Sequence, residues 1–290
     1  ASRGNLTAKD NDVVTLFAVW EEKTYTINFN GNDGNYFGTA NLIDGESASV
    51  TLKYTQSYLL KSVYERTGYT FSHWTTEADG TGTRYNENQS INSLLESGSM
   101  TLYAQWTANR YAINLNENEG SLVGSDIENL TVYAEFNTQK LYTSKTGSVE
   151  AKPVAEREGY EFGGWSTTQN QASSRLIDAS GVLTAIYHTA SDQTVYALWT
   201  ANTYEITLNL NVPESETTAQ IVDNSDPANT ITDGKVYITF DSTTIMNAET
   251  SGVAVKPIAT RTGYTFLGWA TSAGVTTAAG CVIDNQGNLK

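Results

Sequence analysis

One phrase of ten residues occurs three times in the chain and constrains the fold more than any other feature. Each copy contains Arg-x-Gly-Tyr-x-Phe-x-x-Trp, and the copies end at Trp74, Trp165 and Trp269. Only glycine reaches positive φ without steric cost, so the glycine predicts a turn into a strand. Tyr and Phe lie two residues apart and therefore share one face of an extended segment. The Trp breaks this alternation, which predicts a bulge or a strand end after Phe.

Three large rings within six residues predict the core-forming strand of a small domain, because each ring removes a large apolar area from water. A second phrase, Thr-[Leu/Val]-[Tyr/Phe]-Ala-x-Trp, recurs at residues 15–20, 101–106 and 194–199 and predicts a closing strand. In that strand Leu102, Ala104 and Trp106 are expected to face inward together. The residues assigned to the structural core motif are Gly68, Tyr69, Phe71, Trp74, Trp106, Gly159, Tyr160, Phe162, Trp165, Trp199, Gly263, Tyr264, Phe266 and Trp269.

The two phrases divide the chain into tandem units. Their spacing indicates a repeat of about 90 residues, which is large enough for one modest core. We expect a C-terminal tail of a preceding repeat at 1–20, repeat one at 21–106, repeat two at 107–199 and repeat three at 200–290, the last lacking its closing strand. The fold class is mainly β, with small domains arranged as elongated beads on a string.

Each repeat opens with an alternating strand, as at Tyr25, Ile27 and Phe29. Residues 90–95 are the best candidate for a short helical turn, with Ser90 as its N-cap. Only four residues separate a closing Trp from the next opening Tyr. Four extended residues span at most about 14 Å, so neighbouring repeats are expected to touch with limited flexibility.

Charge and cysteine content narrow the possible partners. The chain has 32 acidic against 17 basic residues, a net charge of −15, which argues against nucleic acid or an anionic membrane as a partner. Cys281 is the single cysteine, so no intrachain disulfide is possible. No stretch approaches the roughly 18 apolar residues of a membrane span, so direct membrane insertion of these residues is not expected.

The order of the motifs resembles the Listeria–Bacteroides repeat family, which includes the B-repeat of internalin-type surface proteins. The resemblance rests on Tyr-x-Ile-x-[Phe/Leu]-Asn, Arg-x-Gly-Tyr-x-Phe-x-Gly-Trp and Thr-Leu-Tyr-Ala-x-Trp, and it covers essentially the whole chain. It implies a small β-grasp-like α+β domain, an extracellular location on the bacterial cell surface or in the secreted fraction, and a spacer or adhesive role. It carries over no catalytic residues. The repeats are longer than the common family unit, and His73 replaces the family glycine.

Candidates for chemistry are sparse in the sequence. No metal, cofactor or catalytic residue is predicted, and an enzyme is the least favoured class. Calcium is a weak alternative at the loops 32–35 and 223–226, which offer carboxylate and amide oxygens. Neither loop has the spacing of an EF-hand, and solvated turns are the favoured interpretation.

The aromatic residues separate into repeating and non-repeating positions. All six Trp, including Trp20, are interpreted as core residues. Arg66, Arg157 and Arg261 precede the Gly-Tyr turn and are expected to cover an aromatic face or to bond a turn carbonyl. The aromatics that do not recur are better candidates for exposure: Tyr36, Phe37, Tyr58, Tyr85, Tyr142 and Tyr187.

Three functions remain open at this point. The first is a structural stalk whose partners are neighbouring repeats of the same protein. The second is a module whose repeat-specific loops bind a host or bacterial glycan or protein. The third is a subunit of a head-to-tail filament, in which the strand at 15–20 completes repeat three of another molecule.

Overall fold

The computed structural model describes residues 13–36, 49–124 and 126–290. It divides into two compact units, the first holding repeat one and the second holding repeats two and three together. Strands and short 3-10 turns make up the regular structure of the described residues, and none of their helices is long and apolar enough to cross a membrane. The mainly β class is therefore confirmed, while the β-grasp assignment stays a prediction.

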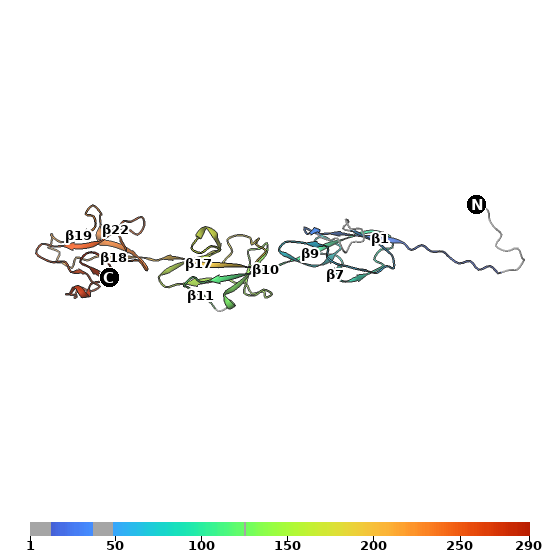
Figure 1. Ribbon diagram of the computed structural model, residues 1–290, viewed down its shortest axis with the longest axis horizontal. Helices are drawn as coiled ribbons and strands as arrows, with labels where there is room; N and C mark the ends of the chain where they lie inside the picture. Colours follow the sequence, from blue (N-terminus) through green and yellow to red (C-terminus); the bar gives the residue numbers. More distant parts are fainter. Residues whose placement is uncertain (1–12, 37–48, 125) are drawn as a thin grey trace. The chain divides into compact units, whose positions relative to one another are not determined.

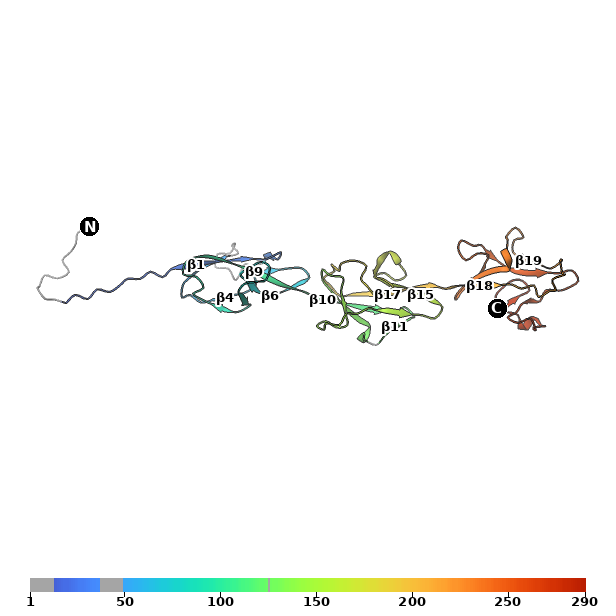
Figure 2. The ribbon, with the colours of Figure 1, turned by 180° about the vertical axis from the view of Figure 1, so that it is seen from behind.

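Repeat one is built on a five-stranded sheet in the order β3-β1-β9-β6-β7. Its central strand β9 carries the closing phrase and pairs in parallel with β1 (Figure 1). On its other side β9 pairs antiparallel with β6, which carries the ten-residue phrase (Figure 2). The strands are β1 (Thr24–Asn30), β3 (Ser49–Lys53), β6 (Tyr69–Thr75), β7 (Arg84–Asn86) and β9 (Gly98–Ala108). Two small ladders join β2 (Asn35–Tyr36) to β5 (Tyr64–Glu65) and β4 (Tyr58–Leu59) to β8 (Ser90–Ile91).

Repeat two repeats this arrangement, with the closing strand β17 again between the opening strand β10 and the phrase strand β15 (Figure 2). The six-stranded sheet has the order β13-β12-β10-β17-β15-β16. Its strands are β10 (Arg110–Asn116), β12 (Thr131–Glu135), β13 (Leu141–Tyr142), β15 (Tyr160–Ser166), β16 (Arg175–Ile177) and β17 (Gln193–Ala201). A side ladder pairs β11 (Ser121–Val123) with β14 (Val154–Glu156), and the 3-10 turns are η1 (Glu128–Leu130) and η2 (Ala172–Ser174).

Repeat three has strands that correspond to the opening strand, its antiparallel neighbours and the side ladder of repeat two, but its main sheet is divided in two. The opening strand β18 belongs to a sheet in the order β18-β20-β21-β22, whereas the phrase contributes only β24 to a separate pair with β25. The strands are β18 (Thr203–Thr207), β19 (Gln220–Asp223), β20 (Lys235–Thr239), β21 (Ile245–Met246), β22 (Ala254–Val255), β23 (Pro257–Thr260), β24 (Gly268–Trp269) and β25 (Ile283–Asp284). β19 pairs with β23, and the 3-10 turns are η3 (Thr232–Gly234) and η4 (Ala278–Gly280).

Each repeat has its own hydrophobic core under its sheet. Trp74 and Trp165 are fully buried, and Trp269 is buried at the same place in repeat three. The closing strands contribute alternate residues, of which Leu102 and Ala104 are fully buried in repeat one. Alternation along an extended strand thus supplies the core, as the sequence pattern predicts.

The turn and the bulge within the ten-residue phrase are both present. Gly68 and Gly159 have φ of 81° and 77°, in the left-handed region that favours glycine. The pairing of β15 with β17 shifts register between Phe162 and Trp165, which turns the Trp ring inward after the bulge.

Two sequence expectations about local structure are wrong: the helical turn at 90–95, and the exposure of four of the aromatics that do not recur. Ser90 and Ile91 form the strand β8, because they pair with Tyr58 and Leu59, so residues 90–95 are not a helical turn. Tyr142 and Tyr187 are buried, and Tyr58 and Tyr85 pack against the first core.

Tyr142 and Tyr187 are buried because each contacts residues of its own repeat that do not recur in the other repeats. Tyr142 lies in β13 at the sheet edge, where the guanidinium of Arg110 covers its ring at 3.3 Å. Tyr187 donates its hydroxyl to the carbonyl of Ser191. Tyr36 is 38% exposed, in line with its expected exposure, and Phe37 lies outside the described residues.

Trp20 is also placed differently from its sequence assignment. It is 88% exposed rather than in a core, and Leu16 and Phe17 are exposed with it. The described part of this segment, from Val13 to Lys23, pairs with no strand within the described residues and leads into β1 as an extended stretch (Figure 2).

Candidate functional site at the junction of repeats two and three

A single residue separates the last strand of repeat two from the first strand of repeat three. β17 ends at Ala201 and β18 begins at Thr203. The backbone N–H of Asn202 donates to the carbonyl of Gly159 at 2.9 Å, and its carbonyl accepts the N–H of Phe240 at 2.9 Å. Asn202 therefore ties the turn of the ten-residue phrase to the end of β20 in the next repeat.

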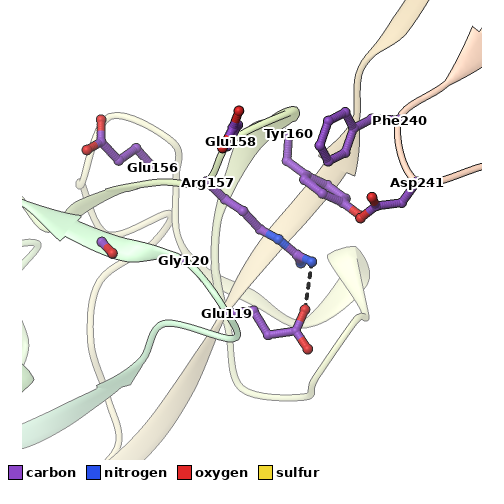
Figure 3. Close-up of a pocket in the computed structure, with 9 residues that line it drawn as sticks. Glu119, Gly120, Glu156, Arg157, Glu158, Tyr160, Phe240 and Asp241 are labelled. Atoms are coloured by element: carbon purple, nitrogen blue, oxygen red, sulfur yellow. Dashed lines mark hydrogen bonds and ion pairs between the residues drawn. The ribbon is translucent and has the colours of Figure 1, made fainter.

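The ring of Tyr160 sits at the centre of this junction (Figure 3). Its centroid lies 5.6 Å from that of Phe240, with an interplanar angle of 76°, which is the edge-to-face geometry that aromatic pairs prefer. Its hydroxyl donates to Oδ2 of Asp241 at 2.9 Å. One tyrosine of repeat two thus contacts two consecutive residues of repeat three.

Arg157 supports the ring of Tyr160 from within repeat two. Its guanidinium carbon lies 3.9 Å from the ring centroid, and Nη2 forms an ion pair with Oε2 of Glu119 at 2.6 Å (Figure 3). The Arg157 side chain is mostly buried, whereas Glu119 is exposed. Stacking on the aromatic face and the ion pair together fix the orientation of the guanidinium, so Arg157 supports one face of the Tyr160 ring.

The electrostatics of the junction favour the protonated phenol. The hydrogen bond to Asp241, followed by burial, raises the pKa of Tyr160, while the nearby Arg157 lowers it by a smaller amount. A phenol that donates to a carboxylate remains neutral because its deprotonation places two negative charges side by side.

An open hollow of about 610 Å³ lies beside the junction. Four carboxylates and one guanidinium line it, from Glu119, Glu156, Glu158, Asp241 and Arg157 (Figure 3). This lining is net acidic, and the guanidinium is already engaged by Glu119 and Tyr160. The arrangement is suited to joining two repeats, because Arg157 is engaged by Glu119 and Tyr160 within repeat two, and Asp241 of repeat three accepts the hydroxyl of Tyr160.

The stacking of arginine on tyrosine recurs in all three repeats. Arg66 lies 4.2 Å from the ring of Tyr69, and Arg261 lies 3.9 Å from that of Tyr264. The acid that pairs with the arginine is Asp33 in repeat one and Glu216 in repeat three. The expectation that these arginines cover an aromatic face is confirmed.

The tyrosines of the phrase therefore need a correction. The sequence assigned Tyr69, Tyr160 and Tyr264 to the core with Phe and Trp, but none of them belongs to a core cluster. Tyr264 is 67% exposed. In repeat two, Tyr160 is the first residue of β15 and pairs with Ala201, the last residue of β17, so its ring lies on Arg157 at the end of the repeat while Trp165 enters the core.

The Phe of the ten-residue phrase and the Trp of the closing phrase pack against each other at the edge of the core in repeats one and two. Phe162 contacts both Trp165 and Trp199, with centroid distances of 5.5 Å and 5.4 Å. Phe71, Trp106 and Phe266 are partly buried against their cores in the same way. Gly263 has φ of 79°, like its two counterparts.

Sequence reasoning missed the repeat-three side of the junction. Phe240 and Asp241 follow strand β20, and Asn202 was treated only as part of a linker. A signal was present, because repeat two has the similar pair Phe136-Asn137 at the same place, where repeat one has Tyr54-Thr55. An aromatic residue followed by a turn residue at the end of a strand does not by itself predict a contact surface, because the position of the neighbouring repeat must also be known.

The two candidate calcium loops use their oxygens internally. The carboxylate of Asp223 is buried and accepts hydrogen bonds from Ser225, Asn229 and the N–H of Lys256. Burial opposes ionisation of Asp223, but these hydrogen bonds outweigh it and lower the pKa to about 2. In the other loop, Oδ2 of Asp33 pairs with Nη2 of Arg66 at 3.3 Å, and the side-chain amide of Asn32 donates to the carbonyls of Ala78 and Ala104. No group of three acidic, histidine or cysteine residues that could hold a metal ion occurs in the described part of the chain.

Comparison with known proteins agrees with the repeat pattern. The profile of the Listeria–Bacteroides repeat domain matches residues 25–105, 111–198 and 229–284. Two proteins of Evansella cellulosilytica are similar to the chain. One, named "Putative Gly-rich membrane protein", is 30% identical over 200 residues, and the other, named "Putative membrane protein", is 29% identical over 199 residues. Each alignment covers 68% of this chain but only 19% and 24% of the two relatives. No solved structure matches the chain.

Proposed function

The chain belongs to the Listeria–Bacteroides repeat domain family, and on that premise we propose that it is a stalk of a bacterial surface protein. In this role the tandem repeats act as a stiff spacer that holds another part of the protein away from the cell. Its direct partners are neighbouring repeats, and it carries no catalytic activity. The stalk is extracellular, either attached to the cell wall or secreted.

The junction at Tyr160 is the observation that supports this role. A flexible array needs a linker that rotates freely, but Asn202 is bonded on both sides, to Gly159 and to Phe240. The pairing of Tyr160 with Asp241 adds a side-chain link across the same boundary. Relative rotation of repeats two and three breaks these contacts together, so the junction resists bending.

The names of the relatives and the charge of the chain support the location. Both relatives from Evansella cellulosilytica are named as membrane proteins. The net charge of −15 keeps neighbouring molecules apart and keeps the chain soluble at a surface. A single cysteine leaves repeat stability to packing rather than to disulfides, so each repeat depends on its own core.

A second candidate function is binding of a glycan or a protein through the repeat-specific loops. The loop after β13 in repeat two favours it, because Arg110 holds this loop in place. Its Nη1 donates to the carbonyls of Ser144 and Lys145, and its Nε pairs with Glu135 at 3.2 Å. A loop fixed in this way presents a defined surface. Burial of Tyr142 and Tyr187 removes two rings on which a sugar could stack.

Small-angle scattering of the 290-residue chain at low concentration tests the stalk. A compact protein of this length has a radius of gyration of about 19 Å, whereas three touching domains in a row give at least about 28 Å. The stalk predicts the larger value and one narrow distribution of lengths. A value near the smaller figure contradicts it.

A loop replacement tests the binding alternative. If loop 143–149 is the contact, replacing it by the shorter connection of repeat one abolishes ligand binding.

A further inference from the structure

The opening and closing strands of repeats one and two are parallel neighbours in their sheets. Residues 25–30 of β1 pair with residues 98–103 of β9, and residues 113–116 of β10 pair with residues 193–196 of β17. The chain enters each repeat at the start of the opening strand and leaves it at the end of the closing strand. The two points at which the rest of the chain pulls on a repeat therefore lie on strands that are bonded to each other.

Tension along the chain loads this pair of strands in shear. The opening strand is pulled back beyond its first residue, whereas the closing strand is pulled forward beyond its last residue. Because the two strands are parallel, these pulls act in opposite directions along one ladder of hydrogen bonds. All bonds of the ladder then resist the pull together, whereas a pull across the strands breaks them one after another.

Neither strand of the pair lies at an edge of its sheet. β1 lies between β3 and β9, and β9 lies between β1 and β6. In repeat two, β10 and β17 also have a strand on each side. Side chains of these two strands meet in the core, where Ile113, Val195 and Ala197 are fully buried. Sliding of one strand past the other therefore disrupts the ladders on both sides and exposes apolar surface to water.

Two side chains in each of these repeats bridge the segment after the opening strand and the closing strand. In repeat two the side-chain amide of Asn118 donates to the carbonyl of Ala197 at 3.1 Å. The indole of Trp199 donates in the opposite direction, to the carbonyl of Glu117 at 3.1 Å. These bonds connect the two parts of the repeat that tension pulls apart. The matching bonds of repeat one run from Asn32 to Ala104 at 3.0 Å and from Trp106 to Gly31 at 2.9 Å.

We propose that repeats one and two are mechanical clamps, in which the parallel pair of opening and closing strands resists tension along the chain. The inference rests on the proposed stalk, because a stalk that joins a cell to what it holds is pulled along its length. Under that pull a clamp stays closed until its closing strand slides past its opening strand. The recurring Asn and Trp cross-link these two strands, in addition to their contribution to the fold.

Constant-force stretching of repeat two within the 290-residue chain tests the proposal. In a Cys281→Ala background, handles at Thr107→Cys and Thr203→Cys pull along the opening and closing strands. Handles at Lys140→Cys and Ser173→Cys pull across the strands, from the β13 edge of the sheet to the β16 edge. The four labelled positions are exposed. Opening releases about 280 Å of chain in the first geometry and about 90 Å in the second.

The two pulling geometries are expected to differ in the lifetime of the folded repeat. At one force, the repeat pulled along its strands should last at least about a hundredfold longer, because several hydrogen bonds must break together instead of one at a time. This comparison uses the same fold in both geometries, so it does not depend on a variant that fails to fold.

Two tryptophans of repeat two provide a matched pair of variants for the pull along the strands. Trp199→Phe removes the donor to Glu117, which bridges the clamp, whereas Trp165→Phe removes the donor to Pro153, which does not. We expect Trp199→Phe to shorten the lifetime under force about tenfold and Trp165→Phe to leave it within about twofold. An interaction that persists while the strands slide does not change the rate of opening. Circular dichroism confirms that both variants fold.

Two results would overturn the proposal. Equal lifetimes in the two pulling geometries would show that the parallel ladder does not resist the pull. A loss of lifetime in Trp165→Phe as large as that in Trp199→Phe would show that resistance follows the overall stability of the repeat. Either result leaves the stiffness of the array untouched, because scattering measures that property, so failure of the clamp and failure of the stalk are distinguishable.

Discussion

The phenolic oxygen of Tyr160 lies 2.9 Å from Oδ2 of Asp241 and donates to it across the boundary between two repeats. In repeat two, the ten-residue phrase therefore contributes both to the hydrophobic core and to the contact with the next repeat. Its Trp is buried in the core of its own repeat, as Trp165 is, and its Tyr lies at the end of the repeat where the next one begins. A single motif thus couples folding of a repeat to its attachment to a neighbour.

Gly159→Ala is expected to disrupt the junction more than the same change at Gly263. Both glycines have φ near 80°, so both variants bear the strain of a Cβ in the left-handed region, about 1–2 kcal/mol. A Cβ on Gly159 would also meet the ring of Phe240, whereas one on Gly263 meets nothing within 4 Å. Hydrogen exchange at the amide of Asn202 should accelerate strongly in Gly159→Ala and stay unchanged in Gly263→Ala. Equal exchange in the two variants would contradict the contact.

Trp165→Phe is expected to destabilise its repeat more than Trp74→Phe. The indole of Trp165 donates to the carbonyl of Pro153 at 2.9 Å, and the substitution leaves that carbonyl without its donor at a cost of about 1–3 kcal/mol. The indole nitrogen of Trp74 is buried without an acceptor among the described residues, so its loss carries no such cost. Hydrogen exchange in β17 and in β9 measures the two effects separately. A larger loss of protection in repeat one would show that Trp74 is bonded in solution.

Acid should destabilise repeat three through Asp223. Because the pKa of this carboxyl is lowered to about 2 from its usual 3.8, its charge stabilises the fold above pH 3.8. This contribution, about 2 kcal/mol, is lost as the pH falls from 3.8 to about 2. Asp223→Asn should reduce the pH dependence in this window, leaving the part due to Glu216, whose pKa is also lowered to about 2, and Asp226→Asn, at an exposed neighbour, should leave it unchanged. Unfolding followed by circular dichroism between these pH values provides the measurement.

Alkali should loosen the junction through Tyr160. Its pKa is raised above 10.0, so the bond to Asp241 contributes fully below pH 10.0 and is lost as the pH rises through the raised value. Nuclear magnetic resonance of Cζ-labelled tyrosine follows this titration, and Tyr160→Phe identifies the resonance. Asp241→Asn should bring the pKa back toward 10.0. A titration that is indifferent to Asp241→Asn would show that the hydrogen bond does not form in solution.

The periodic part of the structure could be predicted from the sequence. Alternation at Tyr25, Ile27 and Phe29 gives β1, and the break after Phe162 gives the bulge, because both depend on the two-residue period of a strand. Burial of Trp165 follows from the same pattern.

What could not be predicted depends on partners outside the pattern. Tyr187 is buried in the core of repeat two, so its lack of recurrence did not mean exposure. Trp20 shares the motif of Trp199, but its segment pairs with no strand among the described residues and its side chain is exposed, because a motif predicts a strand without identifying the sheet that it joins. The contact of Tyr160 with Phe240 joins residues from different repeats, and that geometry is set by the linker rather than by either sequence phrase.

The most direct test of the stalk is the distance distribution between spin labels in repeats two and three. Labels at Ser173→Cys and Thr271→Cys, both exposed, in a Cys281→Ala background leave the junction untouched. A rigid junction predicts one narrow distance peak in the unmodified junction and a broad distribution in Phe240→Ala. A broad distribution in the unmodified junction, or a peak that Phe240→Ala leaves narrow, would contradict the account.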